Sequence, residues 1–140
     1  MLVGLPGSGK STYAQRLGVN AISSDEIRRM LADDPADQTV HRKVFATVRY
    51  LIQRRLDVGR PVTYVDATNL TIKDRRPYIK LGQLRNCAVD AVFFDVPLEV
   101  CMERNRTRTR IVPDGALRDM AARMVVPSVA EGFSQIEVVH

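Results

Sequence analysis

The sequence predicts an α/β fold, a doubly wound parallel sheet of about five strands with helices on both faces. Short apolar segments rich in β-branched residues alternate with longer segments whose apolar residues recur at three- and four-residue spacing. The segment 88–94 is almost continuously apolar, as in a strand that is covered on both sides. A glycine-rich turn joins the first strand to the first helix. Strands that alternate with helices pair in parallel.

The elements follow in chain order. Turn signals bound five strand candidates, at residues 1–3, 19–22, 61–65, 88–94 and 133–139. Helical spacing predicts helices at 10–17, 25–31, 72–84, 98–104 and 116–125, and a long apolar stripe from Val40 that ends at Gly59. The first strand is short for a central position, which is consistent with residues missing upstream, through truncation or through a misassigned start.

Composition describes one ordinary globular domain covering residues 1–140. Of these residues, 45% are hydrophobic and 26% are charged, and no repeat or flexible linker divides the chain. Cys87 and Cys101 are isolated from each other and from both histidines, which favours reduced thiols over a zinc site or a redox pair. No segment is long and apolar enough for a membrane span. We therefore expect a cytoplasmic protein without a membrane partner.

The charge balance favours anionic partners. The formal net charge is +5, and only four of the 21 basic residues are lysines. Arginine presents a planar fork that matches phosphate oxygens, so nucleotides, nucleic acids and phosphorylated metabolites are the expected classes of ligand. A solvated basic surface would show the same composition.

Residues 4–11 match the pattern G-x-x-x-x-G-K-[ST] between a predicted strand and a predicted helix. Glycines let successive N–H groups turn around an anion, and the helix N-terminus adds its dipole. This predicts a nucleoside triphosphate, ATP or another, as cofactor, with Lys10 on the β- and γ-phosphates and Ser11 as ligand of Mg²⁺. No lysine is followed two positions later by Asp, which argues against a GTPase. The ATP-binding residues predicted in this way are Gly4, Leu5, Pro6, Gly7, Ser8, Gly9, Lys10, Ser11 and Thr12.

The second predicted strand ends just before Asp25, where ligands bind in open α/β sheets. A kinase needs a carboxylate that orients the acceptor hydroxyl and accepts its proton, and Asp25 is placed for that role. Arg28 lies three residues further on, on the same helical face, and could hold an anionic part of the acceptor. The alternative interpretation is that Ser24 or Asp25 only caps the helix. Spacing alone leaves both interpretations open.

The third strand is followed by Asp66, Thr68 and Asn69, which are further candidates for binding the substrate. Asp66 is either a carboxylate on the metal side or a residue that holds the loop. Arginines then occupy every second position of the segment 104–110. A lid could bring two of them onto the transferring phosphoryl group, whereas a solvated basic surface is the alternative. The arginines in question are Arg104, Arg106, Arg108 and Arg110.

These motifs resemble the P-loop polynucleotide 5′-hydroxyl kinases, namely the kinase domain of the phage enzyme and that of bacterial RNA-repair end-healing proteins. The resemblance covers nearly the whole chain, and its markers are Gly4 to Ser11, Ser24-Asp25-x-x-Arg28, Asp66-Ala67-Thr68-Asn69, Glu103-Arg104-Asn105 with Arg108, and Val112-Pro113 leading to Leu117-Arg118.

The resemblance implies an adenylate-kinase-like fold with an arginine-bearing lid. It implies that Asp25 is the general base for the 5′-hydroxyl group, that Arg28 holds the phosphate of the terminal nucleotide, and that Thr68 assists. Arg104 and Arg108 are implied as the catalytic lid arginines. The partners would be 5′-OH ends of RNA or DNA, in nucleic acid repair, although no phosphatase or ligase segment accompanies the motifs.

Two other functions compete with a polynucleotide kinase. Related P-loop enzymes that phosphorylate a metabolite, nucleoside or antibiotic hydroxyl share the Asp after the second strand and the arginine lid. A module that binds nucleotide without phosphoryl transfer is the third, and no feature of the sequence favours it.

Overall fold

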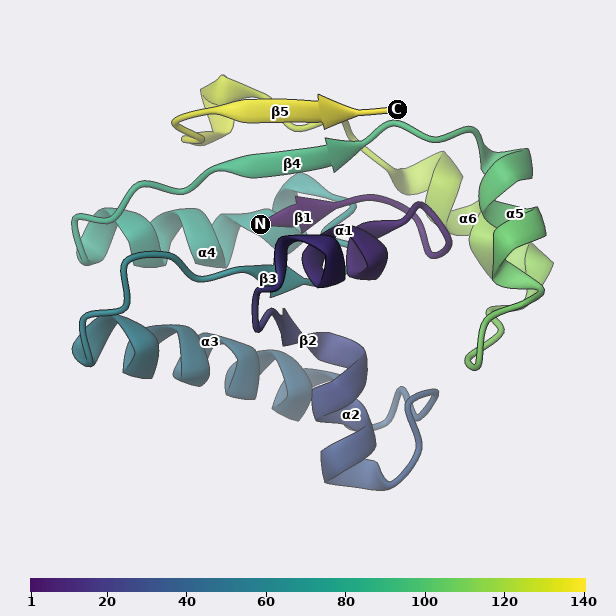
Figure 1. Cartoon of the computed structure of the whole chain (residues 1–140), viewed down its shortest axis with the longest axis horizontal. Coiled ribbons are helices and arrows are strands. Elements are labelled where there is room, and N and C mark those ends of the chain that lie inside the picture. Colours follow the sequence, from purple (N-terminus) through teal and green to yellow (C-terminus); the bar gives the residue numbers. More distant parts are fainter. The chain divides into compact units, whose positions relative to one another are not determined.

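Five strands and six α-helices alternate along the chain, and the computed structural model describes all residues from 1 to 140 (Figure 1). The strands are β1 (Leu2–Val3), β2 (Ile22–Ser23), β3 (Val65–Asp66), β4 (Ala91–Phe94) and β5 (Ile136–Val139). The helices are α1 (Lys10–Leu17), α2 (Ser24–Ala32), α3 (His41–Asp57), α4 (Ile72–Leu84), α5 (Leu98–Asn105), α6 (Asp114–Arg123) and the short 3₁₀-helix η1 (Val129–Glu131). Every strand pair is parallel, which confirms the predicted α/β class.

The observed strands are shorter than the apolar segments that predicted them. Strand β5, for example, begins at Ile136 although the apolar segment begins at Phe133. A ladder exists only where a neighbouring strand offers partners, and Ile136 is the first residue of β5 opposite β4. Helix α6 begins at Asp114, two residues before the expected start, directly after Pro113, which is a favourable residue at the entrance to a helix.

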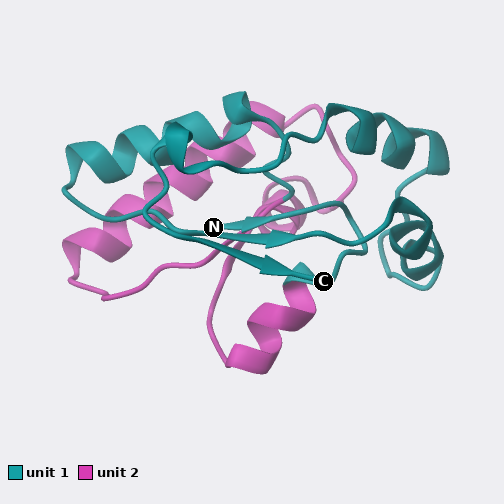
Figure 2. Cartoon of the chain, turned by 90° about the horizontal axis from the view of Figure 1, so that it is seen from above, with its two compact units in different colours: residues 1–10, 68–140 teal, residues 11–67 magenta.

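The chain divides into two compact units (Figure 2). Unit 1 comprises residues 1–10 and 68–140, and unit 2 comprises residues 11–67. In unit 1, β4 lies between β1 and β5, with Leu2 opposite Val92 and Ala91 opposite Ile136. In unit 2, β2 pairs with β3, so that Ser23 lies opposite Asp66. The five expected strands are thus hydrogen-bonded as a group of three and a group of two.

Two buried apolar clusters support unit 1. One brings together Leu5, the C-terminal part of α5 and the first part of α6, through Cys101, Met102 and Leu117. Its members Cys101 and Leu117 are fully buried, and Val112 joins them from the segment between the two helices. This cluster therefore fixes α5 against the turn that follows β1.

The other cluster of unit 1 packs β1 and β4 against α4. It contains Val3, Ile79, Ala91, Phe93 and Phe133. Alternate residues of β4 contribute to it, as expected where one face of a sheet is covered by a helix.

Unit 2 is built on its two-stranded sheet and on helices α2 and α3. Val44 and Val48, four residues apart on α3, are fully buried, and Ile27 of α2 is buried as well. Helix α2 begins at the end of β2, where the Ser23 side chain accepts a hydrogen bond from the Glu26 N–H. Among the helices of the chain, none combines the length and the apolar character that crossing a membrane requires.

Candidate active site

The glycine-rich segment between β1 and α1 forms a turn closed by its own lysine. The Lys10 Nζ atom donates to the carbonyl oxygens of Gly4 at 2.9 Å and Leu5 at 2.8 Å. Gly7 and Gly9 adopt positive φ angles of 82° and 100°. Such alternation turns successive N–H groups to one side, which is the conformation of an anion-binding nest. The predicted phosphate loop thus has the conformation that its chemistry requires.

The phosphate loop, residues 4–11, lies directly against helix α5. A Cβ atom on Gly7 would stand 2.5 Å from the carbonyl oxygen of Cys101, and one on Gly4 would stand 3.0 Å from the Phe94 Cβ atom. The first contact is closer than a Cβ atom tolerates, whereas the second requires the Phe94 side chain to shift by a few tenths of an ångström. Gly7 is therefore required by close packing as well as by its backbone conformation.

Arg104, near the end of α5, reaches the phosphate loop. Its Nη1 atom lies 4.0 Å from the position that a Cβ atom on Gly9 would occupy. Burial raises the pKa of the nearby Cys101 thiol, while the positive charges of Lys10 and Arg104 act in the opposite direction. Two cations therefore border this end of unit 1, as a site for a polyanionic nucleotide requires.

The other three arginines of the predicted lid follow α5. Arg108 and Arg110 are half-buried, whereas Arg106 is exposed and lies 3.9 Å from Asp114 across an ion pair. That exposed pair contributes little to stability. A phosphate contact by any of these three arginines stays a prediction.

Thr68 and Asn69 hold the strand that leads into the phosphate loop. The Thr68 carbonyl oxygen accepts a hydrogen bond from the Gly4 N–H at 3.0 Å, and the Asn69 Nδ2 atom donates to the Leu2 carbonyl at 2.8 Å. Asn69 is buried and adopts a positive φ angle of 50°. The Asn69 amide thus stabilises β1. A contact of Asn69 with an acceptor molecule stays a prediction.

Arg75 of α4, which no sequence pattern singled out, makes several buried hydrogen bonds. Its side chain is 0% exposed and pairs with Glu131 through hydrogen bonds of 2.8 and 2.7 Å. Its Nη1 atom also lies within 2.9 to 3.1 Å of the carbonyl oxygens of Asn69, Leu70 and Val125. Arg75 therefore joins the segment after β3 to the segment around η1.

In unit 2, Ser11 and Asp66 meet. The Ser11 Oγ atom donates a hydrogen bond of 2.7 Å to the Asp66 Oδ2 atom. A hydroxyl and a carboxylate side by side are the protein ligands that P-loop enzymes offer to Mg²⁺. These two oxygen donors therefore fit Mg²⁺ if the oxygens of a bound nucleotide complete its coordination. The protein alone would not hold the ion, because no group of three acidic, histidine or cysteine side chains is present.

Helix α2 presents Asp25 and Arg28 as a pair. Ser23 is the N-cap residue, so the interpretation in which Ser24 or Asp25 only caps the helix is wrong. Asp25 lies in the first turn with its side chain 40% exposed, and Arg28 lies one turn further with its side chain 5% exposed. The two side chains are 3.4 Å apart, on one helical face as predicted.

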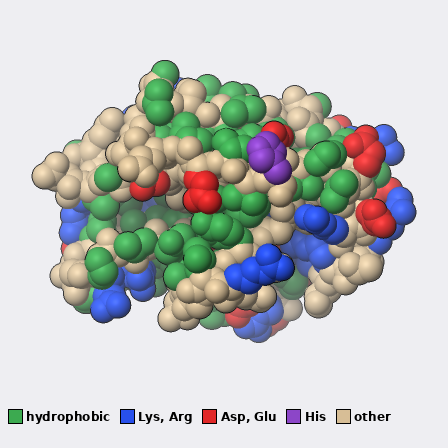
Figure 3. Space-filling model, turned by 45° about the horizontal axis from the view of Figure 1, so that its top comes forward, with side chains coloured by type: hydrophobic (Ala, Val, Ile, Leu, Met, Phe, Trp, Pro, Cys, Tyr) green, Lys and Arg blue, Asp and Glu red, His purple; other side chains and the backbone are tan.

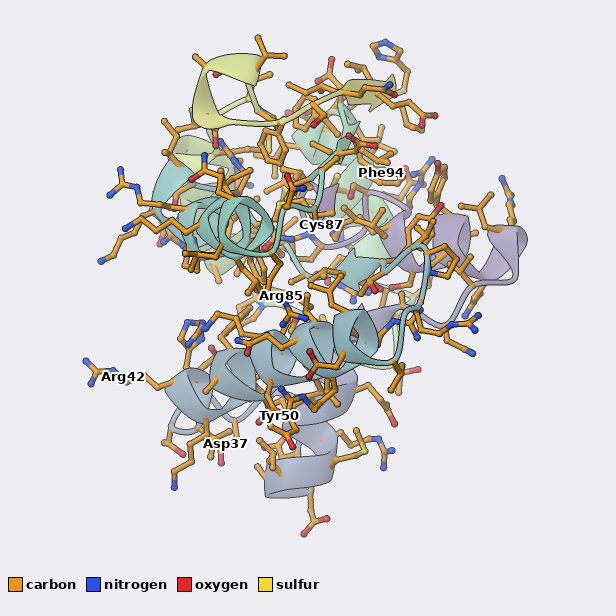
Figure 4. The ribbon with its side chains drawn as sticks, turned by 90° about the vertical axis from the view of Figure 1, so that its left-hand side faces the viewer. Asp37, Arg42, Tyr50, Arg85, Cys87 and Phe94 are labelled. Carbon is orange, nitrogen blue, oxygen red and sulfur yellow. The ribbon has the colours of Figure 1, made fainter.

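The two cysteines belong to no cluster of side chains that could hold a metal. Cys87, labelled in Figure 4, is exposed in the segment after α4. Cys101 is buried, and both are free thiols. On the face that Figure 3 shows, the basic side chains lie in several separate groups rather than in one continuous patch.

Comparison with known proteins places the chain in a family. Residues 1–127 match the family model described as an AAA domain. A bifunctional polynucleotide phosphatase/kinase of Schizosaccharomyces pombe is 25% identical over 99% of this chain and 32% of its own length. The transcription factor bHLH140 of Arabidopsis thaliana is 32% identical over 97% of this chain and 15% of its own length. The chain therefore spans only a third or less of these two relatives.

Two solved structures share the fold. A sugar kinase from Janibacter sp. HTCC2649 has a TM-score of 0.65 at 21% identity and covers 99% of this chain and 82% of its own. A gluconokinase from Sinorhizobium meliloti 1021 has a TM-score of 0.62 at 24% identity, over 99% of this chain and 79% of its own. The chain belongs to the AAA domain family (AAA_33), a family of P-loop kinase domains.

Proposed function

We propose that the chain is a kinase that transfers the γ-phosphate of ATP or another nucleoside triphosphate to the 5′-hydroxyl end of RNA or DNA. Units 1 and 2 would act together as one kinase domain over residues 1–140. The observation that carries the choice of acceptor is the pair of Asp25 and Arg28 on α2. The phosphatase/kinase of Schizosaccharomyces pombe, similar over 99% of this chain, supports it.

Each residue of the pair has a separate role in this proposal. Asp25 is exposed enough to meet an acceptor and would take the proton from the attacking hydroxyl group. Arg28 would hold the phosphate next to the terminal nucleoside. Its Nη1 atom lies 3.4 Å from the Asp25 Oδ1 atom, so both side chains can serve the same end of the acceptor.

The donor side of the reaction depends on charge neutralisation. The N–H groups of the phosphate loop and Lys10 would bind the β- and γ-phosphates, and Arg104 and Arg108 would neutralise the negative charge that the transferring group carries. Ser11 and Asp66 would hold Mg²⁺, which as a bound ion neutralises phosphate charge. The reaction needs positioning and electrostatics but no covalent intermediate on the protein, so we expect no phosphoenzyme.

A small-molecule hydroxyl is the second candidate acceptor, and one observation favours it. The segment between α2 and α3 carries Asp33, Asp34 and Asp37, the last of which is labelled in Figure 4. The pKa of Asp37 is lowered, chiefly by hydrogen bonds from Thr39 and in smaller part by the Arg28 charge. The Asp37 carboxylate, which interacts electrostatically with Arg28, would repel an extended polyanion more than a compact acceptor.

The first experiment incubates the protein and Mg²⁺ with γ-labelled ATP and two matched oligonucleotides, one ending in 5′-OH and one in 5′-phosphate. Parallel samples contain gluconate or a neutral sugar in place of the oligonucleotide. Asp25→Asn is the inactive variant, and Glu26→Gln is its matched control, since Glu26 is the next residue, is exposed and pairs with Arg29.

Label on the 5′-OH oligonucleotide alone, lost in Asp25→Asn and kept in Glu26→Gln, is the expected result. Label on a sugar instead establishes the second candidate. Nucleotide binding with no label on any acceptor, unchanged by Asp25→Asn, is the result that favours a binding module and overturns the proposal.

A second experiment tests Arg28. The acceptors are a nucleoside 3′-phosphate and the corresponding nucleoside without phosphate, and Arg29→Ala is the control because Arg29 is the exposed neighbour that pairs with Glu26. Arg28→Ala is expected to lower kcat/KM about a hundredfold for the phosphorylated acceptor and only severalfold for the nucleoside, since it removes a charged hydrogen bond that only the first makes. Equal losses for both acceptors would contradict the phosphate contact.

A further inference from the structure

Asn105, the last residue of α5, forms a buried clasp with Val112. Its side chain is 0% exposed. The Nδ2 atom donates to the Val112 carbonyl oxygen at 2.6 Å, and the Oδ1 atom accepts from the Val112 N–H at 3.0 Å. The carboxamide thus makes both hydrogen bonds that a paired peptide group would make. It joins two positions seven residues apart and closes the intervening segment, residues 106–111, into a loop, called here the arginine loop.

The main chain of Asn105 also fixes the first half of the arginine loop. Its carbonyl oxygen accepts a hydrogen bond from the Arg108 N–H at 3.2 Å. The preceding carbonyl, of Arg104, accepts from the Thr107 N–H at 3.3 Å and from the Thr107 Oγ1 atom at 3.0 Å. This main-chain bond links the backbone of Arg108 to the end of α5, and every variant at position 105 keeps it.

The arginine loop ends at Val112, in the apolar cluster that supports the phosphate loop, and it begins at the buried Asn105. Val112 is buried together with Leu5 of the phosphate loop and with Leu117 of α6. The residues between the anchors are exposed or half-buried. The clasp therefore connects a solvent-facing segment that carries three arginines to the same apolar base as the phosphate loop.

Asparagine is the side chain that suits this position. Ala offers neither hydrogen-bonding group, ionised Asp offers only acceptors, and Gln is one methylene longer. Removing one partner of a buried hydrogen bond leaves the other without compensation for its lost hydration. If Asn105 only ended helix α5, bonds within the last turn would suffice, but both side-chain bonds reach Val112 instead.

We propose that Asn105 is a positioning residue: its clasp on Val112 holds the arginine loop at the phosphate loop, so that Arg108 is in place when a nucleotide binds. The inference rests on the proposed function in that it gives Arg108 a role at the phosphates. Asn105 itself would touch neither the nucleotide nor the acceptor.

Limited trypsin digestion tests the clasp without any assay of activity, because Arg106, Arg108 and Arg110 are themselves cleavage sites. The variants are Asn105→Asp, which keeps one of the two bonds, and Asn105→Ala. Thr107→Ala is the matched control, since it removes a hydrogen bond in the same loop but leaves the clasp intact. Cleavage sites are identified by mass spectrometry, with and without a nonhydrolysable ATP analogue and Mg²⁺.

Cleavage after Arg106, Arg108 and Arg110 is expected to become about tenfold faster in Asn105→Asp, since loss of one buried hydrogen bond raises the fraction of molecules with an open arginine loop about tenfold. In Thr107→Ala cleavage should become at most about twofold faster. The nucleotide should protect these sites in the wild type and much less in the variant. Unchanged cleavage overturns the proposal, and so does a uniform increase at distant sites such as Arg29 and Arg85, which would show general destabilisation.

Kinetics then separate this inference from the proposed function. With whichever acceptor is labelled, Asn105→Asp should lower kcat about tenfold while KM for ATP changes by less than about twofold, because the phosphate loop still binds the nucleotide. A rise in KM with constant kcat would contradict the positioning of Arg108. If no acceptor is labelled, the proposed function fails, but the digestion still tests the clasp: loss of nucleotide protection in Asn105→Asp supports it, and unchanged protection overturns it.

Discussion

The Ser11 hydroxyl donates a hydrogen bond of 2.7 Å to the Asp66 carboxylate, joining the first turn of α1 to the end of β3. Ser11 follows the lysine of the phosphate loop directly, whereas Asp66 lies 55 residues further along the chain. Their contact is compatible with both interpretations of Asp66, a carboxylate on the metal side and a residue that holds the loop. In the proposed mechanism the two side chains would give Mg²⁺ two oxygen ligands.

Replacing Asp66 with Asn should weaken the response to Mg²⁺ specifically. The amide keeps the shape and a hydrogen bond to Ser11 but loses the negative charge, so we expect kcat to fall about a hundredfold or more and the Mg²⁺ concentration for half-maximal rate to rise. Phosphoryl transfer is measured across a Mg²⁺ titration, with Asp57→Asn, an exposed carboxylate paired with Arg54, as control. An unchanged Mg²⁺ dependence in Asp66→Asn would show that the carboxylate does not serve the metal.

Lys10→Ala and Asp25→Ala should both abolish transfer, for different reasons. Loss of Lys10 removes the ammonium from the phosphate loop, so nucleotide affinity should fall as well, whereas Asp25→Ala should leave nucleotide affinity near the wild-type value. Transfer and nucleotide binding are measured separately, and circular dichroism shows whether the fold is intact. Full activity of Asp25→Ala would remove the base from the proposed mechanism.

Helices with strong local signals were predictable at both ends. Helix α1 follows the phosphate loop, and α4 starts at Ile72, directly after the N-cap residue Thr71, whose side chain forms a reciprocal capping box with Asp74. Such signals act within a few residues and can be read from the sequence. The ends of strands were not predictable to the same degree, because pairing partners lie far along the chain, as for Leu2 and Val92.

In the candidate site, too, features with a local sequence pattern were predictable, whereas features that depend on distant partners were not. The phosphate loop and the three-residue spacing of Asp25 and Arg28 are local patterns, and both appear in the structure. Arg75 and Asn105 carry no local signal, because their bonds reach Val125, Glu131 and Val112. Nothing in the composition separates the fully buried Arg75 from the many exposed arginines. Asn105 belongs to the motif Glu103-Arg104-Asn105, but the motif does not predict its two hydrogen bonds to Val112.

Gly7→Ala should destabilise the protein more than Gly59→Ala. Both glycines have positive φ angles, 82° and 75°, so alanine is strained at either position by about 1 kcal/mol. At Gly59 a Cβ atom would meet nothing within 4 Å, whereas at Gly7 it would stand 2.5 Å from the Cys101 carbonyl oxygen. Backbone cannot yield as a flexible side chain does, so we expect an additional loss of about 2 kcal/mol in Gly7→Ala.

Urea unfolding of the two variants and the wild type measures this difference, and nucleotide binding is measured on the same samples. Gly7→Ala should also bind ATP more weakly, since the phosphate loop must move away from α5, and Gly59→Ala should bind it normally. Equal free energies of unfolding for the two variants would show that the close approach of Gly7 to Cys101 costs nothing to relieve.

The buried pair of Arg75 and Glu131 predicts an acid-dependent loss of stability. Burial by itself would raise the pKa of Glu131, but the hydrogen bonds from Arg75 and Ser128, together with the Arg75 charge, lower it below its ordinary value of 4.5. A carboxyl group whose pKa is lowered by folding stabilises the folded state above its ordinary pKa. That contribution is lost as the pH falls from 4.5 to below the pKa of Glu131 in the folded protein, because the unfolded chain binds the proton at a higher pH than the folded chain.

Glu131→Gln should therefore unfold more easily at pH 7, by about 3 kcal/mol, because Arg75 keeps its charge at 0% exposure without a counter-ion. The same variant should lose less stability than the wild type between pH 5 and pH 3, since the titrating group is gone. Thermal unfolding across this pH range, with Glu137→Gln on the exposed edge of β5 as control, measures both effects. Parallel stability curves for Glu131→Gln and the wild type would mean that Glu131 does not supply the acid dependence.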